Sequence, residues 1–161
     1  DLYVARKIFE AKPNKHVDIG SRIDGFVAHL AVFREVELID IRKPEDKVKN
    51  IGFLQLDLMT LPDGKINYCD SISSLHAIEH FGLGRYNDPI DFLGHIKAIN
   101  NIHLMLEGGG VFYFSVVEGS IVVVDNSASV SDCACSLYGG DRNSKVLIPI
   151  TGYMPSTPLN F

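Results

Sequence analysis

Cysteine is scarce in this sequence: only three occur among 161 residues. Three is an odd number, and their spacing gives neither a disulfide framework nor the paired CxxC units of a structural zinc site. We therefore expect free thiols. Cys133 and Cys135 form a CxC pair, which leaves a two-thiolate metal site as the alternative, although two thiolates without partner ligands hold a metal poorly.

Basic charge is also scarce, with 15 Lys and Arg against 20 Asp and Glu and a formal net charge of -5. Lys and Arg are scattered, whereas a nucleic-acid backbone is recognised by clustered cations, so we expect no nucleic-acid partner. Long apolar runs are absent too: the run at 111–117 is far shorter than the ~20 residues of a membrane span. No charged-then-apolar leader precedes a cleavage site, and the sequence predicts a cytoplasmic protein without membrane association.

What the sequence does contain is an average globular composition, with 46% hydrophobic and 22% charged residues. A chain of this length is typical of one domain that buries roughly two-thirds of its unfolded surface. No internal repeat or linker interrupts it, so we expect a single domain over residues 1–161.

Short apolar runs that are continuous rather than strictly alternating are typical of parallel strands covered by helices on both faces. Five such runs predict strands, at 16–19, 36–41, 51–56, 70–75 and 111–117. Apolar residues at helical spacing predict helices over 25–34 and 91–106, and a short helix over 5–11. The predicted fold class is α/β: a Rossmann-like, doubly wound, mostly parallel sheet with helices on both faces.

Polar and glycine residues mark the expected ends of the helices. Asp24 is placed to cap the start of the helix at 25–34. Residues 107–110, Glu-Gly-Gly-Gly, are expected to end the helix at 91–106, because glycine tolerates positive φ. Toward the C-terminus the pattern weakens, and two further strand candidates lie at 121–124 and 146–150.

The turn after the first expected strand carries the chemistry. The strand runs into Gly20 and then directly into a helix, and a glycine at the carboxyl end of a parallel strand lets a ligand approach bare main chain. Asp40 closes the second strand 20 residues later, where a carboxylate accepts hydrogen bonds from a ribose diol. Together they indicate an adenosine-type ligand. The alternative is that Gly20 and Gly25 only form a tight turn and that Asp40 caps a helix.

Arg22 and Asp24 narrow the choice of ligand. A dinucleotide-binding GxGxxG pattern needs glycine at the position of Arg22, where pyrophosphate presses on the main chain. Asp24 would repel pyrophosphate at the helix N-terminus. A P-loop is disfavoured as well, since the residues after Gly25 are apolar rather than Lys and Ser or Thr. S-adenosylmethionine carries no phosphate, and its ammonium and sulfonium charges suit Asp18 and Asp24.

Over residues 14–117 the chain resembles class I methyltransferases, and most closely a small branch of them that has no assigned function. The matching segments are VDIGSR at 17–22, VELIDIR at 36–42, LQLDL at 54–58 with LP at 61–62, DSISSLHAIEH at 70–80 and LMLEGGG at 104–110. No one segment is specific, but their order and spacing are those of the family. The tail, 120–161, matches the family poorly.

The resemblance implies an S-adenosylmethionine site assembled from the loops after four strands, one for each part of the cofactor. Asp18, Gly20 and Ser21 would hold the methionine part, and Asp40 and Ile41 the ribose. Asp57 and Leu58 would hold the adenine, and Leu75 and His76 would lie near the methyl group. No metal is implied. The methyl acceptor is left open: a small molecule, a sugar or a protein.

His76 and His80 belong to an H-x-x-E-H sequence, which is also a zinc-protease pattern in which both histidines share one helix face. Two observations favour the methyltransferase interpretation: a strand is expected before the pattern, and only Glu107 and Glu118 remain as downstream glutamates, where the protease pattern needs a third ligand on another helix. His80 is then the candidate catalytic base, because imidazole titrates near neutral pH. The alternative is that His80 caps a turn while Tyr86 packs over the cofactor. The other histidines, His16 among them, are expected at the surface or in packing.

The predicted function is S-adenosylmethionine-dependent methyl transfer. Such a reaction asks the protein chiefly to align the nucleophile, exclude water and remove a proton, so no catalytic triad is expected. Two rivals remain. One is a catalytically inactive methyltransferase-like module that binds or scaffolds a partner, which the single glycine of the first loop favours. The other is an NAD-dependent oxidoreductase, which Arg22 opposes.

Overall fold

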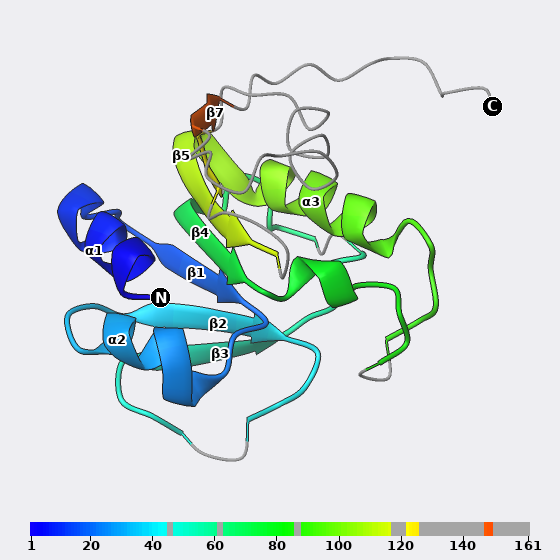
Figure 1. The fold of residues 1–161 in the computed structure, drawn as a ribbon, viewed down its shortest axis with the longest axis horizontal. Coiled ribbons are helices and arrows are strands. Elements are labelled where there is room, and N and C mark those ends of the chain that lie inside the picture. Colours follow the sequence, from blue (N-terminus) through cyan, green and yellow to red (C-terminus); the bar gives the residue numbers. More distant parts are fainter. Residues whose placement is uncertain (45–46, 61–62, 86–87, 117–121, 126–146, 150–161) are drawn as a thin grey trace.

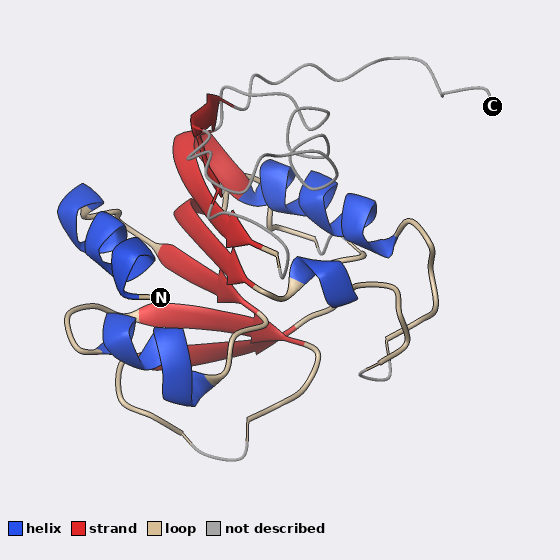
Figure 2. Ribbon diagram, in the orientation of Figure 1, coloured by secondary structure: helices blue, strands red, loops and turns tan. Residues whose placement is uncertain are grey.

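The computed structural model describes residues 1–44, 47–60, 63–85, 88–116, 122–125 and 147–149. Within these residues a seven-stranded sheet forms the centre (Figures 1 and 2). Its strands are β1 (His16–Ile19), β2 (Val36–Asp40), β3 (Ile51–Gln55), β4 (Cys69–Leu75), β5 (Leu106–Ser115), β6 (Val122–Asp125) and β7 (Leu147–Pro149).

The spatial order of the strands is β3-β2-β1-β4-β5-β6-β7. Strands β1 to β5 are parallel, β6 runs antiparallel to β5, and β7 is parallel to β6. The chain leaves β1 toward β2 and β3 on one side and then continues with β4 on the other. The topological switch point, where open α/β sheets place their ligands, therefore lies between β1 and β4.

Helices cover both faces of the sheet (Figure 1). One face packs against α1 (Leu2–Ala11) and α2 (Ala28–Ala31), which is preceded by a π-helical turn, η1 (Ile23–Val27). The other face packs against α3 (Gly94–Met105) and a 3-10 turn, η2 (Ile78–His80). Each face buries its own apolar cluster, so the strands are apolar on both sides. The predicted doubly wound α/β fold is confirmed.

The five predicted parallel strands and the short N-terminal helix are confirmed, with ends that shift by a few residues. The prediction for 107–110 is wrong. The helix ends at Met105, and Leu106 already has extended backbone and pairs with Cys69, while Val111 pairs with Ser71. The intervening glycines bulge out of β5, with Gly109 at φ 81°. Positive φ is indeed required here, but by an irregularity in a strand rather than by a helix end.

The expected helix over 25–34 is shorter and begins irregularly. Gly25 is non-helical (φ −113°, ψ −119°), and the regular α2 spans only Ala28–Ala31. Asp24 does not cap it, which corrects the prediction: its carboxylate pairs instead with the guanidinium of Arg22, Nη2 to Oδ2 at 2.7 Å. The Arg22 guanidinium donates to both oxygens of this carboxylate, at 3.0 and 2.7 Å, which turns it away from the main-chain N–H groups of α2.

Some predictions concern residues outside the described part of the chain: both cysteines of the CxC pair, Tyr86, the LP at 61–62 and most of the tail. The two strand candidates there overlap β6 and β7, although Ile121, Val146 and Ile150 are not described. None of the helices in the described ranges is both long enough and apolar enough to pass through a bilayer.

Candidate functional site

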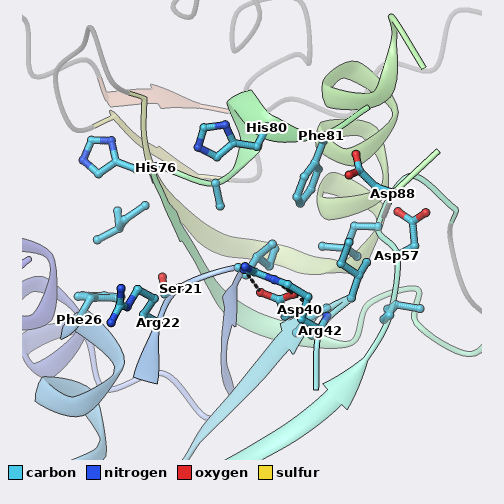
Figure 3. A pocket seen from close by; sticks show the side chains of 18 of the residues that line it. Ser21, Arg22, Phe26, Asp40, Arg42, Asp57, His76, His80, Phe81 and Asp88 are labelled. Atoms are coloured by element: carbon cyan, nitrogen blue, oxygen red, sulfur yellow. Dashed lines mark hydrogen bonds and ion pairs between the residues drawn. The ribbon is translucent and has the colours of Figure 1, made fainter. Parts of the chain in front are cut away.

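A cleft of about 660 Å³ opens at the carboxyl ends of β1, β2, β3 and β4. Its size lies within the range of sites for small molecules and cofactors, roughly 300 to 1,000 Å³. Figure 3 shows side chains from all four strand ends converging on it. The sequence-predicted residues that line it are Gly20, Ser21, Asp40, Ile41, Asp57, Leu58, Leu75, His76 and His80.

Gly20 presents bare main chain to the cleft. Its φ of 74° is left-handed, and its N–H donates to Ile39 O across to β2 at 2.9 Å. A Cβ at this position would lie 2.8 Å from Ala77 Cβ in the loop after β4. Two independent constraints, the backbone conformation and the close approach of the β4 loop, therefore require glycine.

Asp18 is the one predicted cofactor residue that does not line the cleft. It lies beneath the loop with no exposed surface. Ser73 Oγ donates to its Oδ2 at 2.5 Å, and Ser21 N–H donates to its Oδ1 at 3.3 Å. Burial raises the pKa of Asp18 to about 6, although the hydrogen bonds from Ser73 and Ser21 act in the opposite direction. Its connection to the cleft is through the main chain of Ser21.

Asp40 faces the cleft from the end of β2, with its side chain 11% exposed, but its carboxylate is engaged by Arg42. The Arg42 Nε and Nη2 donate to its two oxygens at 3.1 and 3.0 Å, and the Arg42 main-chain N–H donates to Oδ1 at 2.7 Å. A carboxylate offers about four acceptor positions. Arg42 already uses three of these positions, so a diol that bonds to both oxygens would have to displace one of its hydrogen bonds.

The loop after β3 supplies a third wall. Asp57 Oδ1 accepts the N–H of Met59 at 2.8 Å, which closes a turn at the cleft edge. Leu58 is buried, and its carbonyl accepts a hydrogen bond from Asn101 Nδ2 of α3 at 2.8 Å. The turn is thus tied to the helix behind it, and Leu58 gives this wall an apolar surface.

The loop after β4 presents imidazoles. His76 has φ 57°, uncommon for a residue with a side chain, and its N–H donates to Ser115 O at 3.0 Å. Its Nδ1 lies 3.9 Å from Glu79 Oε1, and neither Glu79 oxygen has a hydrogen-bond partner in the described residues. His80, at the end of η2, also lines the cleft, and Figure 3 shows it with His76 in the upper part of the view.

The H-x-x-E-H pattern is not on an α-helix. His76 follows the end of β4 in a left-handed conformation, and only Ile78–His80 form a single 3-10 turn. The two histidines therefore cannot share a helix face, as the zinc-protease interpretation requires. Among the described residues no group of three His, Cys, Asp or Glu is arranged to hold a metal ion.

Sequence reasoning missed several residues of the site. Arg42, Phe81 and Asp88 also line the cleft. Asp88 Oδ2 accepts the N–H groups of Gly82 and Gly84 at 3.0 and 3.2 Å, which shapes the loop beside the cleft. Arg42 follows Asp40, the expected ribose-binding carboxylate, by only two residues, and this spacing could have indicated it. Nothing in the local pattern indicated Asp88.

The cleft fits an S-adenosyl compound. Gly20 presents bare main chain to the cleft, Asp40 offers the carboxylate that a ribose diol needs once Arg42 releases one of its hydrogen bonds, and Leu58 offers an apolar wall for a flat base.

A family model described as Caenorhabditis protein of unknown function, DUF268, matches residues 32–130, more than half of the chain. A comparison with curated proteins found no match.

Similar folds occur among solved structures. The N-methyltransferase NodS from Bradyrhizobium japonicum WM9, in complex with S-adenosyl-l-homocysteine, is 17% identical with a TM-score of 0.52, over 70% of this chain and 58% of that chain. The Burkholderia thailandensis 1,6-didemethyltoxoflavin-N1-methyltransferase, with bound 1,6-didemethyltoxoflavin and S-adenosylhomocysteine, is 16% identical with a TM-score of 0.54, over 76% and 56%. The PH0226 protein from Pyrococcus horikoshii OT3 is 19% identical with a TM-score of 0.55, over 73% and 52%.

These likenesses show that the chain has the class I methyltransferase fold, as the sequence predicted. The chain spans between half and three-fifths of the length of the three solved structures.

Proposed function

The chain belongs to the family described as Caenorhabditis protein of unknown function, DUF268, and from its cleft we propose that it is an S-adenosylmethionine-dependent methyltransferase. The observation that carries the proposal is that Gly20 main chain and the Asp40 carboxylate line one cleft at the switch point of a methyltransferase fold. When bound, the cofactor would supply a methyl group on a positively charged sulfur. The acidic net charge of -5 supports an acceptor other than nucleic acid.

Each wall of the cleft has a separate task in this proposal. Gly20 and Ser21 receive the methionine part at the main chain, Asp40 binds the ribose hydroxyls, and Asp57 with Leu58 receives the adenine. His76 lines the region near the methyl group. His80 accepts the proton of the acceptor where the acceptor is a hydroxyl or a protonated amine.

The direct test is isothermal titration of the protein with S-adenosylhomocysteine, with NAD titrated as the comparison ligand. We expect binding of the first and none of the second. Asp40→Asn should lower the affinity for S-adenosylhomocysteine about tenfold, because it removes a charge-assisted acceptor of ribose hydroxyls. Arg42→Gln is the matched control: it keeps the carboxylate and removes the guanidinium from it, while the main-chain hydrogen bond of residue 42 stays, so the affinity should stay equal or rise up to about threefold.

The role of His80 needs a second measurement. His80→Ala should leave S-adenosylhomocysteine binding unchanged within about twofold. Release of S-adenosylhomocysteine from S-adenosylmethionine, assayed with panels of small hydroxyl and amine acceptors, should fall about a hundredfold, which is typical of a lost general base. Unchanged turnover in the variant would eliminate the base role.

A second candidate function is a catalytically inactive module with this fold. The bidentate pairing of Arg42 with Asp40 favours it, since this pairing occupies the carboxylate that a ribose would need. Absence of heat with S-adenosylhomocysteine at millimolar concentration, in both the wild-type protein and Arg42→Gln, would favour this module over the enzyme.

A further inference from the structure

A chain of buried polar side chains runs beneath the loop after β1. His16 and Asp18 of β1 face Ser71 and Ser73 of β4 on the sheet face covered by α1 and α2. His16 Nδ1 lies 2.8 Å from Ser71 Oγ, His16 Nε2 lies 3.0 Å from Ser73 Oγ, and Ser73 Oγ lies 2.5 Å from Asp18 Oδ2. All four residues are at most 2% exposed. We call this set the buried relay.

When Asp18 is ionised, only one placement of the hydrogen atoms satisfies all the hydrogen bonds of the relay. A serine hydroxyl has a single hydrogen to give. Ser73 gives it to Asp18, at a length typical of a bond between a hydroxyl and a carboxylate. Ser73 Oγ must then accept from His16, which places the imidazole hydrogen on Nε2. His16 Nδ1 is left as an acceptor for the hydrogen of Ser71.

The imidazole is suited to this neutral role. Burial, and to a smaller extent the Arg34 guanidinium, lowers the pKa of His16 to about 3. Arg34 is the charged side chain that acts on His16 among the described residues, while Asp18 is contacted by the uncharged groups of Ser73 and Ser21. Near neutral pH the relay therefore holds one negative charge, on Asp18, whose pKa is about 6.

The relay reaches the cleft through a single carboxylate. Asp18 Oδ2 accepts from Ser73, and Asp18 Oδ1 accepts from the main-chain N–H of Ser21 in the loop that lines the cleft. Neither His16 nor Ser73 lines the cleft. Any effect of these two residues on a ligand must therefore pass through Asp18 and the loop.

We propose that His16 and Ser73 are positioning residues for the ligand-binding loop: through Asp18 they hold Gly20 and Ser21 in the geometry that binds the S-adenosyl compound. The inference rests on the proposed function for its ligand. Two structural parts of the inference can be tested without any ligand. They are the placement of the hydrogen atoms in the relay and the hydrogen bond that holds the Ser21 N–H.

The affinity test compares three serine variants by titration with S-adenosylhomocysteine at pH 7.5. Ser73→Ala should weaken binding about tenfold, because it removes the donor that fixes Asp18. Ser73→Thr keeps the hydroxyl and should bind within about threefold of wild type. Ser74→Ala is the matched control: Ser74 is equally buried on the same strand but donates to Ile19 O, at 3.3 Å. Its affinity should stay within about twofold of wild type.

The ligand-free test uses nuclear magnetic resonance. The ¹⁵N spectrum of His16 at pH 7.5 should show a neutral ring with its hydrogen on Nε2, and the Ser21 amide should exchange about tenfold faster in Ser73→Ala than in wild type. If Ser73→Ala does not fold, Ser73→Cys, whose thiol is a weaker donor than the hydroxyl, should also make the Ser21 amide exchange faster than in wild type.

The outcomes separate the two proposals. A wild-type protein that fails to bind S-adenosylhomocysteine would overturn the proposed function, and the Ser21 exchange rates would still decide the relay. Wild-type affinity in Ser73→Ala, an unchanged Ser21 exchange rate, or a His16 hydrogen on Nδ1 would overturn the relay.

Discussion

The loops after β1 and β4 face each other across the switch point and are built in opposite ways. After β1 a glycine takes the positive φ, and the cleft meets main chain at Gly20. After β4 a histidine takes it, and the cleft meets the imidazole of His76, whose side chain is 56% exposed. In the proposed function the first loop would meet the ligand with main chain, and the second would offer imidazole side chains for proton exchange.

The carboxylates behind the two loops differ in the same way. Asp18 is buried beneath the first loop, with a hydrogen bond to each oxygen. Glu79 lies behind the second, with no hydrogen bond to either oxygen in the described residues and His76 Nδ1 at 3.9 Å. A carboxylate that is fully bonded stabilises a fixed geometry, whereas an unbonded buried one is available to a partner that gains charge. The comparison predicts rigidity on the β1 side and chemistry on the β4 side.

The largest expected effect concerns the pH dependence of stability on the β1 side. The pKa of Asp18 is raised from 3.8 to about 6, so the folded state binds its proton more tightly than the unfolded state, and this stability is lost as pH rises from about 4 to 6. The pKa of His16 is lowered from 6.5 to about 3, so its contribution is complete above pH 6.5 and is lost as pH falls toward 3. Between pH 4 and 6 the two contributions have opposite slopes.

Asp18→Asn should remove the pH dependence of stability that comes from Asp18 and leave the one that comes from His16. Relative to wild type, the variant should gain up to about 3 kcal/mol of unfolding free energy between pH 4 and 6, measured by urea unfolding at several pH values. Asp24→Asn, in the same loop but exposed and paired with Arg22, is the control and should show only a small slope of opposite sign, because the pKa of Asp24 is lowered. Parallel pH profiles for wild type and Asp18→Asn would contradict the buried, charged relay.

The next largest effect is expected from a substitution in the loop after β1 itself. Gly20→Ala should lower the affinity for S-adenosylhomocysteine roughly a hundredfold, because its Cβ meets Ala77 Cβ at 2.8 Å and forces the loop to move. Gly64→Ala is matched in conformation, with φ 72°, but its Cβ would meet nothing within 4 Å. It should cost about 1 to 2 kcal/mol of stability and leave the affinity unchanged. Equal affinities in the two variants would show that the contact between the loops is not needed.

The β1 side also shows how far the sequence leads. The strands and the Gly20 turn were predictable because apolar runs and glycine are local signals. The relay was not, because His16 and its two serine partners are 55 and 57 residues apart and meet only through the parallel register of β1 and β4. Taken singly, a histidine and two serines in apolar strands indicate nothing more than packing.

Elsewhere the sequence supplied the right residue and left its neighbours undetermined. The glycines at 108–110 indicated positive φ, which Gly109 adopts, but the same signal serves a helix end and a strand bulge, and only the pairing of Leu106 with Cys69 decides between them. Asp40 was predicted in the cleft, where it lies, but its pairing with Arg42 depends on the path of the chain after β2. The predicted roles of these residues toward a cofactor stay predictions.

The smallest expected effect comes from a substitution that places glycine at the positive-φ position of the loop after β4, as in the loop after β1. His76→Gly should raise the unfolding free energy by at most about 1 kcal/mol, since glycine relieves the left-handed conformation but loses more backbone entropy on folding. Lys12→Gly is the matched control, with φ 50° at the end of α1. If the gain at His76 is smaller than at Lys12, the difference measures what the imidazole contributes beside Glu79. Equal gains would mean that His76 is held there without help from Glu79, and the proton-exchanging role of this side would then rest on His80 alone.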